Sequence, residues 1–371
     1  MRFFNKTWHK PDYKFIITLI LIVVFGLILL SSASISLSYN KFGEGYYYVK
    51  HQILFGLIPG LILLILLSLV DYRIWKKAAF AFLIFSILLL IFVFIPSIGA
   101  EFGTAKRWLY VLGVSFQPSE LVKLTFLIYL ATWLENRGSK KAGDFSEGLV
   151  PFLTVLGIIA FLLILQPDIG TMSIIVLVSL TVYFIGGAKL SHLLGVGAAA
   201  IAGLLVLIKM APYRTARLMT FLHPELDPQG IGYHINQAFL AIGSGGFWGR
   251  GFGMSRQKFQ YLPEVAGDSI FAIIAEELGF LFSVILVLAF LYLMYRGFKI
   301  AQKVPDNFAK LLVAGIISWI FIQSFVNIGA MVGLLPLTGA PLPFISYGGT
   351  SLMVLLAACG IVINISRQTQ E

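Results

Sequence analysis

The chain has 371 residues, of which 58% are apolar and 12% are charged. A water-soluble globule of this composition would expose much of its apolar surface, so the sequence excludes an ordinary soluble protein and indicates an integral membrane protein. The formal net charge is +10. Because the basic residues are dispersed between apolar runs and form no patch with interleaved aromatic residues, we expect no nucleic-acid partner.

Apolar runs of about 18–25 residues follow one another along the chain, and this is the length that a helix needs to cross ~30 Å of hydrocarbon. They predict an all-α integral membrane protein with about ten transmembrane helices in one bundle, so that residues 1–371 form a single polytopic membrane domain. The first run is too long for a signal peptide and is expected to remain as an anchor. The predicted spans are 13–36, 48–70, 77–97, 118–135, 149–165, 170–187, 190–210, 268–295, 309–331 and 346–366.

Lys and Arg residues predict how the bundle is oriented. They gather before the first predicted span and after the second, fourth, sixth and eighth spans, which all lie on one side of the membrane if there are ten spans. Because cytoplasmic loops carry an excess of basic residues, both termini are expected in the cytoplasm. Cys359 is the only cysteine, so the chain can form no intramolecular disulfide and no cysteine-based metal site.

Two motifs place charged residues at the start of predicted spans. In FQPSELVKL (116–124), Glu120 and Lys123 are three residues apart, which brings the two side chains together on a helix. The pair can neutralise two charges that are costly in a membrane, or it can line a polar path. In LQPDIGT (165–171), Asp168 can cap the helix that follows or can have a functional role, and both interpretations stay open.

The segment 211–266 is the longest stretch without an apolar run, and prolines and glycines are frequent in it. The parity of the spans predicts a long extracytoplasmic loop between the seventh and eighth helices. A loop of this length with little helical periodicity is uncommon unless it binds something. It is either a solvated crossover or a basic cradle for an anionic lipid head group or diphosphate. We favour the cradle, whose candidate residues are Arg214, Arg217, Arg250 and Lys258.

The stretch YLPEVAGDSIFAIIAEELGF (261–280) opens the eighth predicted span with several carboxylates. Asp268 would lie at the first turn, where free amides and the helix dipole favour its charge, so it can be an ionised base or a plain N-cap. Glu264 lies in the preceding loop and is a candidate to assist it. Glu276 and Glu277 lie deeper and on different faces of the helix, so each is expected to pair with a basic or hydroxyl group.

The motif LPLTGAPLPFISYGGTSL (335–352) holds three prolines and a pair of glycines before the last span. Non-helical backbone at membrane depth is tolerated only where it is buried in protein or lines a cavity. Residues 335–346 are therefore expected to form a re-entrant or interfacial loop that shapes one wall of a polar cavity. Ser346, at the end of this loop, is a candidate substrate contact.

The absence of several common catalytic and metal-binding motifs limits the reactions that the chain is expected to catalyse. The chain has no Gly-x-x-x-x-Gly-Lys-Ser/Thr loop, no His-Glu-x-x-His and no Gly-x-Ser-x-Gly, and its histidines are scattered, so we expect no bound metal. A carboxylate beside a basic loop suits a base-assisted displacement on a lipid-linked substrate with an anionic leaving group. Mg²⁺ or Mn²⁺ is expected, if at all, with the diphosphate of the substrate. A transporter is the competing interpretation, since charged residues in membrane helices also mark substrate paths.

Five separated motifs resemble those of one protein family. In chain order they are FQPSELVKL, QPDIGT, YHINQAFLAIGSGGFWGRGFG, YLPEVAGDSIFAIIAEELG and LPLTGAPLPFISYGGTSL. They look like the motifs of the SEDS family of bacterial shape, elongation, division and sporulation proteins, over nearly the whole chain. The resemblance implies a ten-helix peptidoglycan glycosyltransferase in the bacterial cytoplasmic membrane, with its active site on the outer face. Members polymerise lipid II through β-1,4 bonds and release undecaprenyl diphosphate.

The resemblance also implies roles for residues and partners. The essential aspartate of the family matches Asp268, the polar pair of its fourth span matches Glu120 and Lys123, and its Gln-Pro-Asp aspartate matches Asp168. The expected partners are lipid II, a class B penicillin-binding protein and other divisome membrane proteins. The family commonly has His-Thr or His-Ser before the aspartate where this chain has Ala-Gly, which leaves Ser269 as an unplaced polar neighbour.

The motifs at 256–264 and 338–352 look closer to the division members of the family than to the elongation members. The leading hypothesis is therefore an inverting lipid II polymerase for septal wall synthesis in cell division. The alternatives are a lipid II flippase and an elongation-type polymerase.

Overall fold

The computed structural model describes residues 9–95, 99–102, 105–111, 114–210, 212–223, 230 and 232–368. There are two π-helical turns. η1 (Ile53–Leu57) joins the helices Tyr47–Gln52 and Ile58–Leu69, and η2 (Phe145–Leu149) precedes the helix Val150–Leu165. The α-helices are α1 (Tyr13–Phe42), α2 (Tyr47–Gln52), α3 (Ile58–Leu69), α4 (Arg73–Phe92), α5 (Pro118–Ala142), α6 (Val150–Leu165), α7 (Ile169–Ile185), α8 (Leu190–Lys209), α9 (Pro212–Leu222), α10 (Tyr233–Gly245), α11 (Ile270–Lys303), α12 (Asn307–Met331) and α13 (Gly349–Ser366).

A helix lies over each of the ten predicted spans, and the fold class of an all-α, multi-pass membrane protein is confirmed. In the described part of the chain, eight helical segments are long and apolar enough to cross a membrane. Of the predicted spans, the other two are α7, which has 17 residues, and α5, whose first turns carry Glu120 and Lys123. The number of crossings and their orientation stay predictions.

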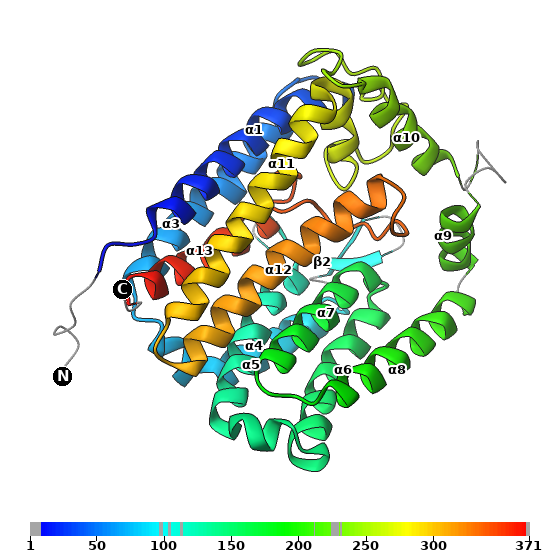
Figure 1. Cartoon of the computed structure of the whole chain (residues 1–371). Helices are drawn as coiled ribbons and strands as arrows, with labels where there is room; N and C mark the ends of the chain where they lie inside the picture. Colours follow the sequence, from blue (N-terminus) through cyan, green and yellow to red (C-terminus); the bar gives the residue numbers. More distant parts are fainter. Residues whose placement is uncertain are drawn as a thin grey trace.

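The helices α12 and α13 form the centre of the bundle. α12 packs on α5, α7 and α11, and α13 packs on α3, whereas α8 lies at the edge of the molecule and has no buried residue (Figure 1). Lipid supplies no hydrophobic driving force between helices, so close packing depends on small residues at the interface. A Cβ atom added at Gly60 would lie 2.7 Å from Leu356, which is how closely α3 and α13 approach.

The helices α1 and α11 lie side by side and run antiparallel (Figure 1). Arg296 pairs with Asp12 at one end, and Ser32 reaches Glu277 further along. α11 breaks at Gly279, where φ is 76°. The segment that follows α10 packs against this break, where the amide of Phe280 donates to the carbonyl of Gly246 over 2.9 Å. The break therefore fixes the chain that leads from α10 towards α11.

The expectation of an irregular loop over 211–266 is wrong for much of its length. α9 and α10 occupy parts of it, and α10 packs on α11. The segment YHINQAFLAIGSG spaces its apolar residues as a helix does, but it is only 13 residues long and is followed by glycines, so it lacks the length signal that identified the spans. Residues 224–229 and 231 of this segment lie outside the described residues.

A small antiparallel sheet between α4 and α5 was not anticipated. Its strands β1 (Gly99–Phe102), β2 (Ala105–Val111) and β3 (Val114–Phe116) pair in the order β1-β2-β3. The third span was predicted to reach residue 97, whereas α4 ends at Phe92. Apolar and aromatic residues continue past that point, and hydropathy alone does not distinguish a helix end from a short strand rich in such residues.

The segment between α12 and α13 is non-helical and largely buried, as expected for the proline-rich motif. Its buried residues include Ala340, Leu342, Phe344, Ile345 and Ser346. Whether it is re-entrant with respect to a membrane stays a prediction. Its contacts with the start of α11 define the site described next.

Candidate functional site

A cavity of about 1030 Å³ opens where α1, α2, β2, α5, α7 and the two non-helical segments before α11 and α13 meet. It contains most of the polar motifs singled out in the sequence. The lining residues with polar or charged side chains include Lys41, Tyr48, His51, Arg107, Ser115, Gln117, Glu120, Asp168, Thr171, Glu264, Asp268, Tyr347, Thr350 and Ser351.

Asp268 lies in the wall of this cavity, directly before α11. Ser269 occupies the N-cap position of α11, so the interpretation of Asp268 as the N-cap is wrong. The amide of Asn327 on α12 donates to the backbone carbonyls of Asp268 and Ala340, each over 2.8 Å. One side chain of the central helix thus holds the aspartate and the proline-rich segment together.

The proline-rich segment also fixes the two residues before the aspartate. The hydroxyl of Ser346 donates to the carbonyl of Gly267 over 2.6 Å, and the amide of Tyr347 donates to the carbonyl of Ala266 over 2.8 Å. Ser346 is buried and is not part of the cavity wall. Its hydroxyl therefore orients the chain at Asp268, and its role as a substrate contact stays a prediction.

Ser269, the unplaced neighbour, is completely buried and bonds to an imidazole. The Nε2 atom of His234 on α10 lies 2.6 Å from its hydroxyl. The resembling family commonly has a histidine two residues before the aspartate, where this chain has Ala266, whereas His234 precedes Ser269 by 35 residues. The sequence could not reveal this, because helix α10 had not been recognised.

The first of the two interpretations of Asp168, the helix cap, is confirmed, and its functional role stays a prediction. It is the N-cap of α7, with 3.4 Å from its carboxylate to the amide of Thr171, and it also lines the cavity. The hydroxyl of Ser119 donates to it over 3.2 Å. Arg107 on β2 lies 3.9 Å away and also donates to the carbonyl of Gln166 over 3.2 Å.

Arg107 is a cavity residue that the sequence analysis missed, because the sheet that carries it was not predicted. Among the described lining residues it supplies the positive charge together with Lys41 at the end of α1. His51 adds an imidazole, whose Nδ1 lies 3.0 Å from the hydroxyl of Tyr347.

Glu120 and Lys123 pair on α5 over 2.7 Å, as their spacing predicts, and both are buried. Lys123 also donates to the Oε1 atom of Gln323 over 2.9 Å, and its ammonium lies 5.0 Å from the ring centre of Trp319. Glu120 reaches the cavity wall, and its Oε2 atom has no hydrogen-bond partner among the described residues. Lys123 therefore has partners on two helices, whereas one buried oxygen of Glu120 has none among the described residues.

Of the four basic residues expected to form a cradle, Lys258 and Arg250 have described side chains, and neither lines this cavity. Lys258 is buried and donates to Glu277 over 2.8 Å, which uses its charge inside the protein. Arg250 lies 3.8 Å from Glu276. The side chains of Arg214 and Arg217 lie outside the described residues, although their backbone belongs to α9. A direct role in substrate binding stays a prediction for all four.

The expectation that Glu276 and Glu277 pair with basic or hydroxyl groups is confirmed. Glu276 accepts from the hydroxyl of Ser255 and from the amide of Arg256, the latter over 3.0 Å. Glu277 accepts from Ser32 on α1 as well as from Lys258. These two carboxylates hold the segment 255–258 against α11 and α1, so they act as parts of the scaffold.

The fold and the site define a class: a multi-pass membrane protein with a large polar cavity whose wall carries several carboxylates and an arginine. The family described as "Cell cycle protein", named for FtsW, RodA and SpoVE, matches residues 12–371. The chain belongs to this family.

Individual relatives match over almost their full lengths. The chain is 40% identical over 364 residues to stage V sporulation protein E of Bacillus subtilis, covering 97% of this chain and 98% of the relative. It is 37% identical over 347 residues to a probable peptidoglycan glycosyltransferase FtsW of Geobacter sp. strain M18, covering 94% of each.

Two solved structures resemble the fold. A chain from a structure titled as a peptidoglycan synthase complex that coordinates polymerization and crosslinking is 28% identical, with a TM-score of 0.80 over 98% of this chain and 100% of that one. The rod shape determining protein RodA of Thermus thermophilus is 28% identical, with a TM-score of 0.72 over 99% of this chain and 100% of that one.

Proposed function

We propose that this chain is a peptidoglycan glycosyltransferase that polymerises lipid II into glycan strands for septal wall synthesis. The observation that carries the proposal is the position of Asp268 in the wall of a cavity of about 1030 Å³ that also contains Arg107 and Lys41. A base and cations in one cavity are what a transfer with an anionic leaving group requires. The relatives named as probable peptidoglycan glycosyltransferases support the choice of substrate.

In the proposed reaction Asp268 takes the proton from the 4-hydroxyl of the acceptor sugar as that oxygen attacks the anomeric carbon of the donor. The new bond is β-1,4, and the bond from the anomeric carbon to the diphosphate breaks with inversion. Undecaprenyl diphosphate leaves with the bonding electrons. Arg107 and Lys41 are positioned to stabilise this negative charge, and Arg214 and Arg217 remain candidates for the same task.

The other cavity residues have supporting roles in this proposal. The carbonyl of Gln166 and the carboxylate of Asp168 both orient Arg107. Glu120 and Lys123 keep polar groups in the wall on the side of α5. Glu264 is exposed beside Asp268 and can accept a hydrogen bond from the incoming sugar.

The proposed setting is the bacterial cytoplasmic membrane, with both termini in the cytoplasm and the cavity opening on the outer face. The basic residues between the predicted spans support this orientation. A class B penicillin-binding protein is the proposed partner, supported by the likeness to a chain of a peptidoglycan synthase complex. Other divisome proteins are further proposed partners, and Mg²⁺ or Mn²⁺ would enter with the diphosphate.

The decisive experiment is polymerisation of lipid II by the purified chain together with its penicillin-binding partner. We expect wild type to produce glycan strands and Asp268→Asn to lose at least about 100-fold in rate, the usual contribution of a general base. The Asn variant keeps the shape of the side chain, so its melting temperature serves as the control. A fully active variant would remove Asp268 from the mechanism. Movement of lipid II across vesicles with no polymer from wild type would favour the flippase instead.

A variant of Arg107 tests the proposed leaving-group site. Arg107→Gln should lower kcat/KM for lipid II by about 10-fold or more, because one charged hydrogen bond to a diphosphate is lost. Lys310→Gln, at the other end of the molecule on α12, is the matched control. Equal kinetics for the two variants would exclude Arg107 as a diphosphate contact.

The same chemistry in sporulation is a second candidate, favoured by the 40% identity to a stage V sporulation protein. Rescue of cells depleted of their division polymerase distinguishes the two roles. Restored septa support a role in division, whereas restored spores without septa support a role in sporulation. Rescue of rod shape alone would favour the elongation-type alternative.

A further inference from the structure

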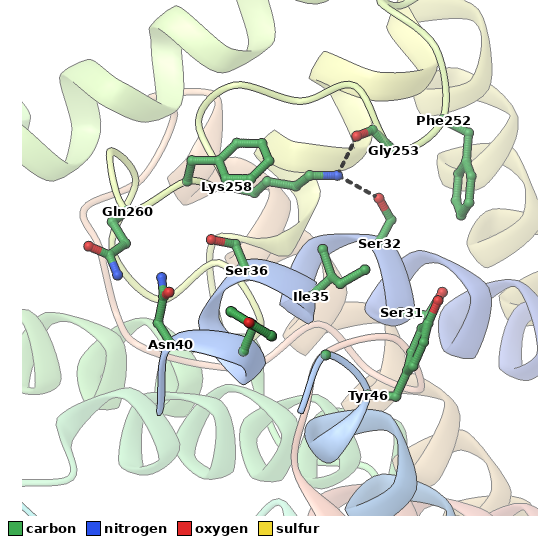
Figure 2. Close-up of a pocket in the computed structure, with 13 residues that line it drawn as sticks. Ser31, Ser32, Ile35, Ser36, Asn40, Tyr46, Phe252, Gly253, Lys258 and Gln260 are labelled. Carbon is green, nitrogen blue, oxygen red and sulfur yellow. Dashed lines mark hydrogen bonds between the residues drawn. The ribbon is translucent and has the colours of Figure 1, made fainter. Parts of the chain in front are cut away.

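A second cavity, of about 760 Å³, lies beside the candidate active site and takes no part in the proposed reaction (Figure 2). The end of α1 separates the two cavities: Leu37 and Lys41 line the first, and Ser36 and Asn40 line the second. The second cavity is closed on its other side by the segment before α11. Its lining comes from residues 31–46 and 252–260.

The lining offers hydrogen bonds without a free charge. Hydroxyl and amide groups come from serines, tyrosines, Asn40 and Gln260, and Figure 2 shows the last two pointing into the same space from α1 and from the segment before α11. Lys258 is the charged residue of the lining, and its ammonium is bound by Glu277 over 2.8 Å and by the carbonyl of Gly253 over 2.7 Å. An anionic ligand would therefore find no available cation here.

Aromatic rings stand around these polar groups. Tyr39 is 66% exposed, Tyr46 53%, Phe252 51% and Phe259 57%. Exposed rings next to neutral hydrogen-bonding side chains suit a ligand with apolar faces and many hydroxyl or amide groups. A saccharide has both: its ring C–H groups pack on aromatic faces, and its hydroxyls and acetamido groups take the hydrogen bonds. A lipid chain would leave the serines and amides unsatisfied.

The segment before α11 lines both cavities, and its backbone is strained at one residue of each lining. Gln260 has φ 69° and Glu264 has φ 50°, in the left-handed region that side chains other than glycine seldom adopt. Gln260 lines the second cavity and Glu264 the first. Strained residues persist only where the surrounding structure holds them, and they cluster at sites that bind ligands. Both cavities share this feature.

The two cavities are close enough for one extended ligand. Glu264 follows Gln260 by four positions, and four extended residues span at most about 14 Å. A polymer whose reacting end lies at Asp268 would reach the second cavity by passing along this short segment.

We propose that the second cavity binds the uncharged saccharide part of the glycan strand, a chain of β-1,4-linked N-acetylated sugars, while its end is held at Asp268. This inference rests on the proposed polymerase function and adds a strand-binding site to it. Retention of the strand between transfers would lengthen the product, since a strand that stays bound is extended again before it is released.

Binding of a defined probe tests the site without relying on catalysis. The probe is the tetramer of β-1,4-linked N-acetylglucosamine, measured by saturation-transfer NMR with the full chain in lipid nanodiscs. We expect binding by wild type, and about five- to ten-fold weaker binding by Tyr39→Ala and by Asn40→Ala, each of which removes a contact of the order of one hydrogen bond or ring face. Asp268→Asn should bind as wild type does.

The control is Tyr295→Ala, which removes a tyrosine that is 55% exposed, lies near the C-terminal end of α11 and does not line the second cavity. Absence of saturation transfer from wild type, or equal transfer from wild type and both cavity variants, would overturn the proposal and leave a lipid or a partner protein as the occupant. Product length is the second readout. Strands made by Tyr39→Ala and Asn40→Ala should be several-fold shorter than those of Tyr295→Ala.

The two proposals fail in different ways. If wild type makes polymer and the cavity variants make strands of unchanged length, the strand site is wrong and the polymerase stands. If wild type makes no polymer with its partner, the proposed function itself fails.

Discussion

Two buried acid–base pairs look alike and have different surroundings. Glu120 and Lys123 are 2.7 Å apart on α5, and Glu277 and Lys258 are 2.8 Å apart between α11 and the segment before it. All four side chains are at most 3% exposed. Both oxygens of Glu277 accept hydrogen bonds, including those from Ser32 at 2.8 and 2.7 Å. The Oε2 atom of Glu120 is buried and has no partner in the described part of the chain, and Glu120 is a residue of the cavity wall.

This difference separates a structural pair from a functional candidate. A buried charge is tolerated when its partners satisfy it completely, and a complete set holds its elements in place. An incomplete set is costly to keep and is found where a ligand completes it. We therefore assign the Glu277 pair to the scaffold and propose Glu120 as a residue of the candidate active site.

The largest expected effect follows from breaking the complete pair. Lys258→Met leaves the buried carboxylate of Glu277 without its cation, which should destabilise the protein by about 3–5 kcal/mol. The double variant Lys258→Met with Glu277→Gln removes both charges and should recover most of the loss. Thermal unfolding in detergent measures both. A single variant as stable as the wild type would show that the pair does not hold the segment.

An intermediate effect is expected at the incomplete pair. In Glu120→Gln the amide oxygen still accepts from Lys123, so the loss of stability should stay below about 2 kcal/mol. The negative charge of this wall residue is lost, so polymerisation should fall by about 10-fold or more. Glu277→Gln, measured in parallel, should show the larger loss of stability. A larger loss of stability in Glu120→Gln than in Glu277→Gln would contradict the assignment of the Glu277 pair to the scaffold.

The smallest effect concerns the strained segment that links the two regions. Gln260→Gly relieves the backbone at φ 69°, worth about 1–2 kcal/mol, but glycine costs about 1 kcal/mol in the unfolded chain. The net change should be a stabilisation of at most about 1 kcal/mol. Phe259→Gly, whose φ is not left-handed, is the control and should destabilise. A loss of stability at Gln260 as large as at Phe259 would show that no strain is stored there.

The sequence located most of the motifs that line the cavity, but it did not show how the cations are paired. It grouped Lys258 with the basic residues of an external loop, whereas this lysine is bound by Glu277, and it overlooked Arg107. Hydropathy and residue type report what a residue is. They do not report which of several carboxylates lies next to a given lysine.

By itself, the sequence determined the membrane class, the positions of the helical spans, the pairing of Glu120 with Lys123, and the place of Asp268 at the start of a helix. These follow from hydropathy, length and spacing within one segment, which are local properties. The tertiary structure alone decided that Ser32 meets Glu277 across 245 residues, that His234 reaches Ser269, and that α1 divides two cavities. These contacts depend on how helices that are far apart in sequence pack together, and the periodicity within one segment does not specify that packing.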